Sequence, residues 1–416
     1  MLYKEIKSCR ICGSNKLIPI VDLGNMVLSG YFPKSNGDQV EAGPLELVKC
    51  DDSSGSGCGL VQLRHNYNLE KLYGDNYGYR SGLNQSMVKH LHSKVNKILS
   101  MIPLSQDDLV IDIGSNDSTL LQAYPKDKLT LVGVDPTGKK FKEYYPEHIH
   151  LVADFFPSAS FLKQFGHKKI KIVTSISMFY DLEDPMTFVT NIHDNLDDNG
   201  VWVFEQSYMP TMLERNSYDT ICHEHLEYYA LKQIKYMLDK AGLKIIDVEF
   251  NDINGGSFSV MAAKKGSKYN ECTGLIDKIL NKEKEIGLNS TKPFNDFNNR
   301  ISKCRDDLLA FFKECKKDGK VVFGYGASTK GNVLLQFCKI TAKDMPYIAE
   351  VNEDKFGCYT PGTNIPIISE AEAKKMSPDY FMVLPWHFKD NIIKREGQFL
   401  SSGKHFMFPL PTVQII

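Results

Sequence analysis

The amino-acid sequence lacks any apolar run long enough to cross a membrane. Hydrophobic residues make up 42% of the 416 positions, but they lie in short segments separated by charged and polar residues. A membrane-spanning helix needs roughly 20 consecutive apolar residues, and the opening segment Met1-Leu2-Tyr3-Lys4-Glu5 does not begin the apolar region of a signal peptide. We therefore expect a cytoplasmic protein with no membrane partner.

The sequence also lacks an excess of either charge. Lys and Arg number 50 against 51 Asp and Glu, so the formal net charge is -1, and the two signs are mixed along the chain. A nucleic-acid surface needs a basic patch or stripe. We therefore expect no nucleic-acid partner.

Three catalytic signatures are missing as well. A zinc metalloprotease requires H-E-x-x-H, but the stretch beginning His223-Glu224 has Glu227 in place of the second histidine. A P-loop requires Gly-Lys, but Gly331 is followed by Asn332. Strict G-x-G-x-x-G, the dinucleotide-binding pattern, does not occur in either glycine turn of the chain. These absences exclude a zincin and a P-loop enzyme and weigh against a typical NAD site.

Ten cysteines in a chain of this length indicate thiols and a metal site rather than a disulfide framework. Four of them lie in a turn-rich first segment, residues 1–69, as the pairs Cys9 and Cys12, and Cys50 and Cys58. Four thiolates satisfy a closed tetrahedral site, so we predict one structural zinc. Seven residues separate the second pair where two are usual, which leaves two unconnected thiol pairs as the alternative.

Apolar strands alternate with amphipathic helices in the rest of the chain, which predicts an α/β protein with mostly parallel sheets. The pattern predicts one α/β domain over residues 70–265, a helical linker over 266–317, and a second α/β domain over 318–416. The first of these ends in two strands, near 243–248 and 257–261, with no helix signal between them. An antiparallel hairpin in that position is typical of a class I methyltransferase sheet.

The first glycine turn favours a nucleoside cofactor without a diphosphate. Acidic residues end the first two strands, and a diphosphate would be repelled by the carboxylate in the turn, whereas a sulfonium amino acid tolerates it. We therefore predict S-adenosylmethionine. After the third strand, an aspartate can accept from the adenine amino group while a phenylalanine packs on the base. The predicted cofactor residues are Asp112, Gly114, Asn116, Asp117, Asp135, Asp154 and Phe155.

The second glycine turn, Gly324 to Asn332, offers backbone amides before a helix, with Ser328 and Lys330 beside them. Such a nest binds phosphate, and Lys330 adds a point charge. We predict that Ser328 and Lys330 bind substrate. A tight turn packed on its sheet is the alternative.

A titratable block follows the fifth strand of the first α/β domain. His223, Glu224 and His225 lie together there, and histidine titrates near neutral pH. Methylation at carbon needs a base, and a neighbouring ketone must stabilise the resulting enolate. We predict His225 as the base, Glu224 as its assistant, and His223 or the hydroxyl of Tyr79 as the donor to the enolate oxygen.

Several motifs in one order carry a family resemblance. They are Cys9-x-x-Cys12, Asp112-Ile-Gly-Ser-Asn-Asp117, Cys222-His-Glu-His-Leu-Glu-Tyr228, Gly255-Gly256-Ser257 and Gly324-Tyr-Gly-Ala-Ser-Thr-Lys-Gly-Asn332. Together with Tyr359-Thr-Pro-Gly-Thr-Asn-Ile-Pro366 and Leu384-Pro-Trp-His-Phe388, the chain resembles the S-adenosylmethionine-dependent nucleotide-sugar C-methyltransferases over essentially its whole length.

The resemblance implies a class I methyltransferase Rossmann-like domain, preceded by a small zinc-binding domain and followed by a second Rossmann-like domain. It further implies a nucleotide-diphosphate 4-keto-6-deoxy sugar as substrate, methylation at carbon 3, His225 as base, and contacts from Tyr73, Tyr77 and Tyr79 to the sugar. Ser118 and Asn254 stand where the family commonly has glycine and histidine, so the cofactor turn and one side-chain contact differ here.

Two other classes of function stay open. The second turn could hold NAD, with Glu350 on its ribose, in a sugar-nucleotide dehydrogenase. A non-catalytic scaffold of a zinc ribbon and two α/β units is also possible, although it has no need of the histidine block. The three tyrosines fit an interdomain aromatic cluster equally well. The sequence does not fix the nucleotide, the stereochemistry of the sugar or the oligomeric state, for which a monomer is our expectation.

Overall fold

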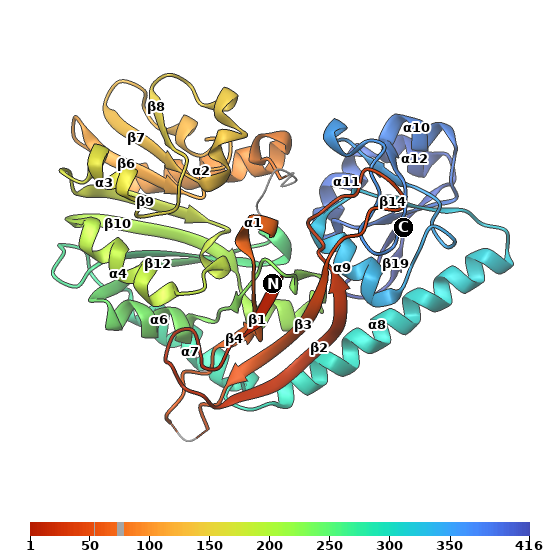
Figure 1. The fold of residues 1–416 in the computed structure, drawn as a ribbon, viewed down its shortest axis with the longest axis horizontal. Coiled ribbons are helices and arrows are strands. Elements are labelled where there is room, and N and C mark those ends of the chain that lie inside the picture. The colour runs from red at the N-terminus through yellow and green to blue at the C-terminus, as the bar shows by residue number, and fades with distance from the viewer. Residues whose placement is uncertain (54, 73–78) are drawn as a thin grey trace.

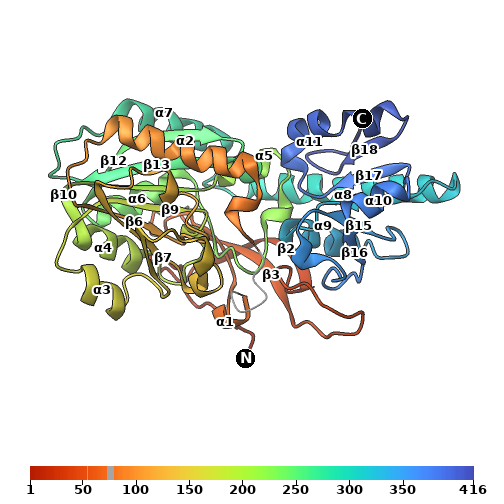
Figure 2. The same cartoon turned by 90° about the horizontal axis from the view of Figure 1, so that it is seen from above.

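The computed structural model describes residues 1–53, 55–72 and 79–416, so Tyr73 and Tyr77 lie outside the described residues. The chain forms an N-terminal sheet region and two α/β units that lie side by side (Figures 1 and 2). This arrangement confirms the predicted fold class. Within the described residues, no helix combines the length and the apolarity that crossing a membrane requires.

The N-terminal region contains two small antiparallel sheets. Its elements are β1 (Tyr3–Glu5), β2 (Leu17–Val27), β3 (Ala42–Cys50), β4 (Val61–Leu63), β5 (His65–Tyr67) and α1 (Leu69–Leu72). Strands β1 and β5 pair with each other, and β2, β3 and β4 form the larger sheet. The fourth strand of that sheet is β11 (Glu227–Tyr228), which comes from the histidine block. The N-terminal sheet therefore holds the block directly, which the sequence did not indicate.

The first α/β unit is built on a seven-stranded sheet. Its elements are α2 (Gln85–Met101), β6 (Asp108–Ile113), β7 (Leu129–Val134), β8 (Ile149–Val152), α3 (Ala159–Phe165), β9 (Ile170–Ile176), α4 (Pro185–Asn195), β10 (Leu196–Ser207), α5 (Met209–Glu214), α6 (Leu231–Lys240), β12 (Leu243–Asn251) and β13 (Ser257–Lys264). The strand order is β12-β13-β10-β9-β6-β7-β8.

Six strands of this sheet run in one direction, and only β13 runs in the opposite direction. The predicted terminal hairpin is present as β12 and β13. This is the strand order of a class I methyltransferase. Because parallel strands end at one edge, the turns after β6, β7 and β9 meet there, where open α/β sheets bind their ligands.

Two helices, α7 (Thr273–Ile286) and α8 (Lys292–Lys317), precede the second α/β unit. The elements of this unit are β14 (Val322–Tyr325), α9 (Thr329–Cys338), β15 (Ile348–Glu350), β16 (Ile367–Ser369), α10 (Glu370–Lys375), β17 (Tyr380–Val383), α11 (Lys389–Arg395), α12 (Gly397–Ser401), β18 (His405–Phe408) and β19 (Gln414–Ile415). The sheet order is β16-β15-β14-β17-β18-β19, parallel except for β19.

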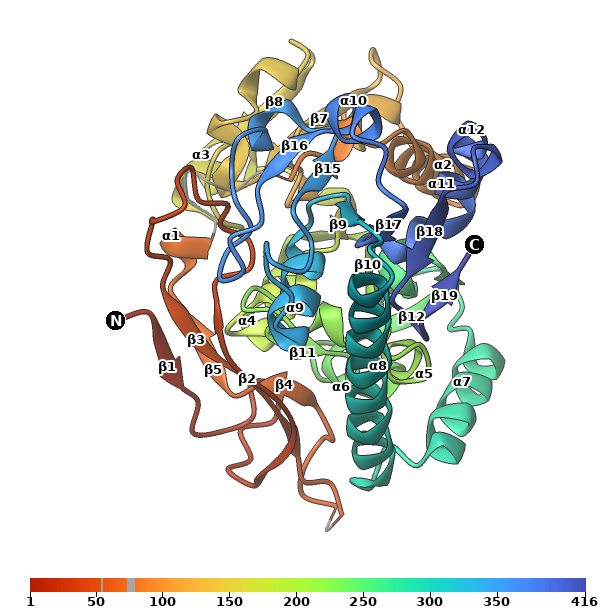
Figure 3. The ribbon, with the colours of Figure 1, turned by 90° about the vertical axis from the view of Figure 1, so that its right-hand side faces the viewer.

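Helix α8 joins the three regions along one axis (Figure 3). It packs against β2, α5 and α9, and the side chain of Asn298 donates to the carbonyl of Ile20 at 2.6 Å. The sequence predicts a packing face that includes Leu308, Leu309 and the two phenylalanines that follow. Leu308, Phe311 and Phe312 are buried, but Leu309 is 41% exposed because it lies on the outer side of the helix.

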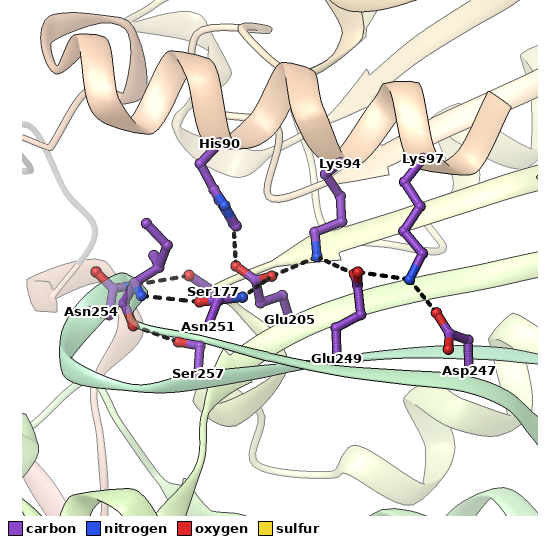
Figure 4. A network of polar contacts seen from close by, with 11 residues as sticks. His90, Lys94, Lys97, Ser177, Glu205, Asp247, Glu249, Asn251, Asn254 and Ser257 are labelled. Carbon is purple, nitrogen blue, oxygen red and sulfur yellow. Dashed lines mark hydrogen bonds and ion pairs between the residues drawn. The ribbon is translucent and has the colours of Figure 1, made fainter. Parts of the chain in front are cut away.

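Charged side chains of α2 form ion pairs with carboxylates on strands β10 and β12 of the sheet (Figure 4). The carboxylate of Glu205 on β10 meets His90 at 2.5 Å and Lys94 at 2.9 Å, and accepts from Asn251 at 2.9 Å. Burial disfavours the ionised carboxylate, but the bond to His90 and the charge of Lys94 hold the pKa of Glu205 below its usual value. Further along, Lys97 bridges Glu249 and Asp247 on β12. The network fixes α2, whose residues Met87 and Leu91 line a cavity between the regions.

Candidate functional site

One cavity of about 700 Å³ lies where the three regions meet. The N-terminal region contributes Gly30 and Phe32, the first α/β unit contributes both its glycine turn and the histidine block, and the second unit contributes the turn before α9. Predicted site residues on its wall are Tyr79, Asp112, Gly114, Asn116, Asp135, Asp154, Phe155, Glu224, His225, Ser328 and Lys330. Residues from distant parts of the sequence thus form one site.

The first glycine turn is held by a carboxylate from the next strand. Gly114 has φ +74°, in the left-handed region, and a side chain there would meet Met178 at 3.0 Å. The backbone N–H of Asn116 donates to the carboxylate of Asp135 at 2.7 Å, and Thr137 donates to its other oxygen from both backbone and hydroxyl. Asp135 is thereby fixed at the end of β7 with its carboxylate on the cavity wall.

This end of the cavity suits a cation. Asp112 is buried and accepts from the hydroxyl of Thr174 at 2.6 Å, and burial raises the pKa of Asp112 to about 7. A cationic sulfonium amino acid placed beside it favours the ionised carboxylate. Asp154 and the half-exposed Phe155 lie on the same wall, as an adenine site requires. The residues present therefore fit S-adenosylmethionine.

Asp117 differs from the other predicted cofactor residues, because its carboxylate faces the chain rather than the cavity. One oxygen accepts from the N–H of Gly82 at 2.8 Å, and the other accepts from the hydroxyl of Thr119 at 2.6 Å. Asp117 is absent from the residues that line the cavity. Its place indicates that it ties the turn to the segment before α2.

In the second glycine turn, as in the first, a backbone N–H donates to an acidic side chain from the next strand. Gly326 has φ +84°, and the N–H of Ala327 donates to the carboxylate of Glu350 at 2.7 Å. The other oxygen of Glu350 accepts from the N–H groups of Val351 and Asn352. Three backbone N–H groups thus hold Glu350 on the cavity wall, much as Asp135 is held in the first turn.

The charge at this second turn is positive. Ser328 caps α9 by accepting from the N–H of Gly331 at 3.0 Å. Lys330 is enclosed beside the cavity, where its ammonium donates to the carbonyl of Asn254 at 2.7 Å. Burial lowers the pKa of Lys330, while the nearby carboxyl of Asp219 acts in the opposite direction. Lys330 is thus a half-buried residue on the cavity wall, where the sequence predicted a point charge for the substrate.

His225 lines the cavity, and within the described part of the chain only one of its ring nitrogens has a hydrogen-bond partner. Its Nδ1 lies 2.8 Å from the carbonyl oxygen of Thr220, and a carbonyl can only accept, so Nδ1 carries the proton. In the neutral ring Nε2 is then an acceptor, as a base requires. Burial, and then the charge of Lys330, lower the pKa of His225 to about 3. The ring packs on Tyr180, with centroids 4.3 Å apart.

Glu224 does not orient His225 through Nδ1, because the carbonyl of Thr220 occupies that nitrogen; an assisting role of Glu224 stays a prediction. Among the described residues, Oε2 of Glu224 is buried with no hydrogen-bond partner, although the residue lines the cavity. Burial raises the pKa of Glu224. The carboxyl therefore lies on the cavity wall and makes no contact with Nδ1 of His225.

His223 points away from the cavity. It is fully buried, its Nε2 lies 3.3 Å from the carbonyl oxygen of Gly43, and its ring meets Tyr67 edge to face. Burial lowers its pKa to about 4. The chain turns between residues 223 and 224, so the two histidines diverge. This geometry makes His223 part of the contact with the N-terminal sheet and leaves it no place as a donor to the enolate.

Tyr79 lines the cavity at its mouth, with its side chain 49% exposed, and its carbonyl accepts from the amide of Asn116 at 3.1 Å. Sequence reasoning missed other wall residues. His387 lies in the motif after β17, and its buried Nδ1 has no partner among the described residues. Lys355 donates to the carbonyl of Ala327 at 2.8 Å. A histidine just after a strand end was the available signal for His387; Lys355 had none.

The four predicted metal ligands converge. Their sulfurs all lie within 4.8 Å of one another, and the pairs Cys9–Cys58 and Cys12–Cys50 are each 3.5 Å apart. Four sulfurs at about 2.3 Å from a zinc ion are roughly 3.8 Å apart, so the set fits a structural zinc. The long spacing is absorbed in a folded loop. Gly57 permits this, because a side chain there would meet the carbonyl of Asp51 at 2.0 Å.

Three family models match consecutive parts of the chain. A zinc binding domain matches residues 9–73, a methyltransferase domain matches residues 87–248, and a C-methyltransferase C-terminal domain matches residues 252–411. The C-methyltransferase NovU from Streptomyces niveus is 28% identical over 426 aligned residues, which cover 100% of this chain and 98% of that protein.

Solved structures of methyltransferases match less than half of the chain at low identity. An S-adenosylmethionine-dependent methyltransferase from Clostridium acetobutylicum is 13% identical with a TM-score of 0.34, over 42% of this chain and 92% of that one. The N-methyltransferase NodS from Bradyrhizobium japonicum is 12% identical with a TM-score of 0.32, over 44% of this chain and 98% of that one.

Proposed function

Because the chain belongs to the S-adenosylmethionine-dependent C-methyltransferases, we propose that it methylates the carbon next to the ketone of a nucleotide-linked 4-keto-6-deoxy sugar, with His225 as the base. The observation that carries the proposal is the tautomer of His225: Thr220 occupies Nδ1, and Nε2 has no partner among the described residues, in a cavity shared by an acidic and a cationic glycine turn. Carbon 3 as the acceptor, and the 4-keto-6-deoxy sugar itself, rest on the sequence resemblance.

The proposed reaction begins with a proton transfer. The proton on the carbon next to the ketone goes to Nε2 of His225, and its electron pair moves into the enolate. Bound S-adenosylmethionine supplies an electrophilic methyl group to that carbon. The carbonyl of Thr220 holds the imidazole in the required tautomer and stabilises the imidazolium that forms. A positioned base contributes roughly 10²–10⁴ in rate.

The pKa of His225 is low when no anion offsets the charge of Lys330. Burial and the charge of Lys330 both oppose protonation of the ring. An anionic substrate, and above all the enolate oxygen, offsets the charge of Lys330, so the pKa of His225 rises as the reaction needs it. The same residue that lowers the basicity of the free histidine thus stabilises the product of its proton transfer.

Lys330 is assigned to the ketone oxygen of the sugar. Its half-buried side chain lines the cavity, and its charge lowers the pKa of both His225 and His387. A fixed cation at a developing oxyanion is a strong stabilising device in a dry site. The N-terminus of α9, with the hydroxyl of Ser328, is assigned to the diphosphate of the nucleotide, because free N–H groups and the helix dipole favour an anion there. Tyr79 at the mouth is assigned to the sugar.

The direct test is methyl transfer from labelled S-adenosylmethionine to 4-keto-6-deoxy sugars on different nucleotides. The matched control for each is the corresponding 4-hydroxy sugar, which has no ketone to stabilise an enolate. Label should enter the keto sugar of at least one nucleotide and no hydroxy sugar. Equal labelling of both forms would rule out enolate chemistry.

A further inference from the structure

Glu224 rests against a position that has no side chain. Gly30 of the N-terminal region lies on the cavity wall, and a Cβ built on Gly30 would come within 2.5 Å of Oε1 of Glu224. Such a separation is far below van der Waals contact, so only glycine leaves room for the carboxyl in this position. The other oxygen, Oε2, is buried and has no hydrogen-bond partner among the described residues.

Gly30 belongs to residues 27–33, which we call the strap, and the strap is held by side chains of α9. The amide of Asn332 donates to the carbonyl of Ser29 at 2.8 Å. Gln336 bonds both the N–H and the carbonyl of Val27, at 2.9 and 3.1 Å. At the other end, the N–H of Tyr359 donates to the carbonyl of Pro33 at 2.8 Å. The strap therefore cannot shift without breaking bonds to the second α/β unit.

The segment that carries Glu224 is fixed to the same N-terminal region from behind. The N–H of Leu63 donates to the carbonyl of Leu226 at 2.8 Å, and β11 pairs with β4. Arg10, between the zinc ligands Cys9 and Cys12, donates to the carbonyl of Leu63 at 2.7 Å and pairs with Glu227 at 3.5 Å. Both the strap in front and the block behind thus depend on one small sheet.

We propose that Gly30 is a positioning residue, which holds the carboxyl of Glu224 where Oε2 binds a hydroxyl of the sugar substrate. This inference rests on the proposed function. It also gives the zinc-bearing region a task in the reaction, because that region supplies both Gly30 and the support for the block. A sugar ring offers hydroxyl groups that can donate to Oε2 or, where Glu224 is protonated, accept from it.

Substitution at Gly30 should displace the carboxyl of Glu224 without lowering the stability of the fold. The φ of Gly30 lies outside the left-handed region, so alanine can adopt its backbone conformation. The atom that an alanine methyl would strike is the end of a flexible side chain, so Glu224 can rotate away at little cost to the fold. The carboxyl is then displaced, and a 1 Å misplacement of a reacting or binding group can cost about 10²-fold in rate.

The experiment compares Gly30→Ala with Gly37→Ala in the full-length zinc-loaded protein. Gly37 is exposed on the same N-terminal region and has no atom within 4 Å of its built Cβ. Gly30→Ala should lower kcat/KM for the keto sugar nucleotide by roughly 10²-fold, with the melting temperature, zinc content and S-adenosylmethionine affinity unchanged. Gly37→Ala should match the wild type throughout. Wild-type activity in Gly30→Ala would overturn the inference.

A double-mutant cycle identifies Glu224 as the group that moves. Glu224→Asp withdraws the carboxyl by about one methylene, so Gly30→Ala should cost far less in that background than in the wild type. Equal losses in both backgrounds contradict the inference. If Gly30→Ala lowers the melting temperature, then Glu224→Ala in the same chain should restore it, and failure to do so also contradicts the contact.

The outcomes separate the two proposals. A wild type that methylates none of the 4-keto sugar nucleotides overturns the proposed function, and this inference with it. A wild type that is active on one of them, together with a fully active Gly30→Ala variant, overturns only the role of Gly30.

Discussion

The two glycine turns share one construction and differ in charge. In each, a glycine with positive φ is followed by a residue whose N–H donates at 2.7 Å to an acidic side chain at or just after the end of the next strand, Asp135 in the first turn and Glu350 in the second. Behind the first turn stands buried Asp112, whereas the second begins a ten-residue helix with Lys330 in its first turn.

The difference shows how one backbone device can serve two ligands. The first turn presents carboxylates to the cavity and suits the cationic S-adenosylmethionine. The second presents a helix N-terminus and the ammonium of Lys330, which suit an anionic substrate. His225 lies on the wall of the same cavity. The electrostatics of a few side chains, rather than the fold of each unit, therefore decide which ligand each turn receives.

The largest effect should follow from removing the base that serves both turns. His225→Asn should reduce methyl transfer roughly 10²–10⁴-fold, because the group lost acts on the acceptor carbon. Affinity for S-adenosylmethionine should stay within a few-fold of the wild type. Exposed His405 offers a matched control, and His405→Asn should leave the rate unchanged. Near wild-type methylation by His225→Asn would contradict the assignment.

Replacing Lys330 should remove the positive charge that distinguishes the second turn from the first. Lys330→Met should lower the rate roughly 10²–10³-fold through loss of oxyanion stabilisation, without weakening S-adenosylmethionine. Lys330 also lowers the pKa of His225, so its loss raises that pKa. The acid limb of the pH–rate profile should therefore move to higher pH, and Lys343→Met, at an exposed site, should not move it. An unshifted acid limb counts against the coupling.

Two aspartates of the first turn should behave differently. Asp135→Ala should weaken S-adenosylmethionine about 10- to 100-fold, in line with the loss of charged hydrogen bonds. Asp117→Asn should change that affinity by no more than a few-fold, because its carboxylate bonds Gly82 and Thr119 outside the cavity. Titration calorimetry measures both. If Asp117→Asn weakened S-adenosylmethionine binding more than Asp135→Ala, the proposed position of the cofactor would be wrong.

The smallest effect expected is a pH dependence of cofactor binding. The pKa of Asp112 is raised to about 7, so its carboxyl is protonated below that pH and ionised above it. A cationic ligand favours the ionised form, so affinity should fall as the pH falls. Between pH 7.5 and pH 6 the expected loss is roughly five- to tenfold. Asp112→Asn should remove this dependence, and a flat wild-type profile would argue against a charge contact.

The sequence predicted what depends on local pattern. Apolar runs located the long strands, glycines marked both turns, and cysteine pairs marked the zinc ligands. Short strands had no such signal, because two to four residues carry no usable periodicity. Strands β11, β16, β18 and β19 were missed for this reason. The domain boundaries after residues 69, 265 and 317 stay predictions.

The directions of the side chains in the site were harder to predict from the sequence. The block placed three titratable residues together, but the turn at 223 and 224 sends His223 to the N-terminal sheet and His225 to the cavity. The role of Gly30 depends on an approach by a residue 194 positions away in sequence, Glu224, which no local pattern encodes. Non-local contacts of this kind follow only from the packed structure.

The most direct test of the account follows the sugar proton itself. The wild type is incubated in deuterated water with the 4-keto sugar nucleotide and S-adenosylhomocysteine, which has no methyl group to transfer. Nε2 of His225 should exchange the proton next to the ketone for deuterium, and His225→Asn should not. Exchange by the variant at the wild-type rate would contradict the assignment of His225 as the base in this cavity.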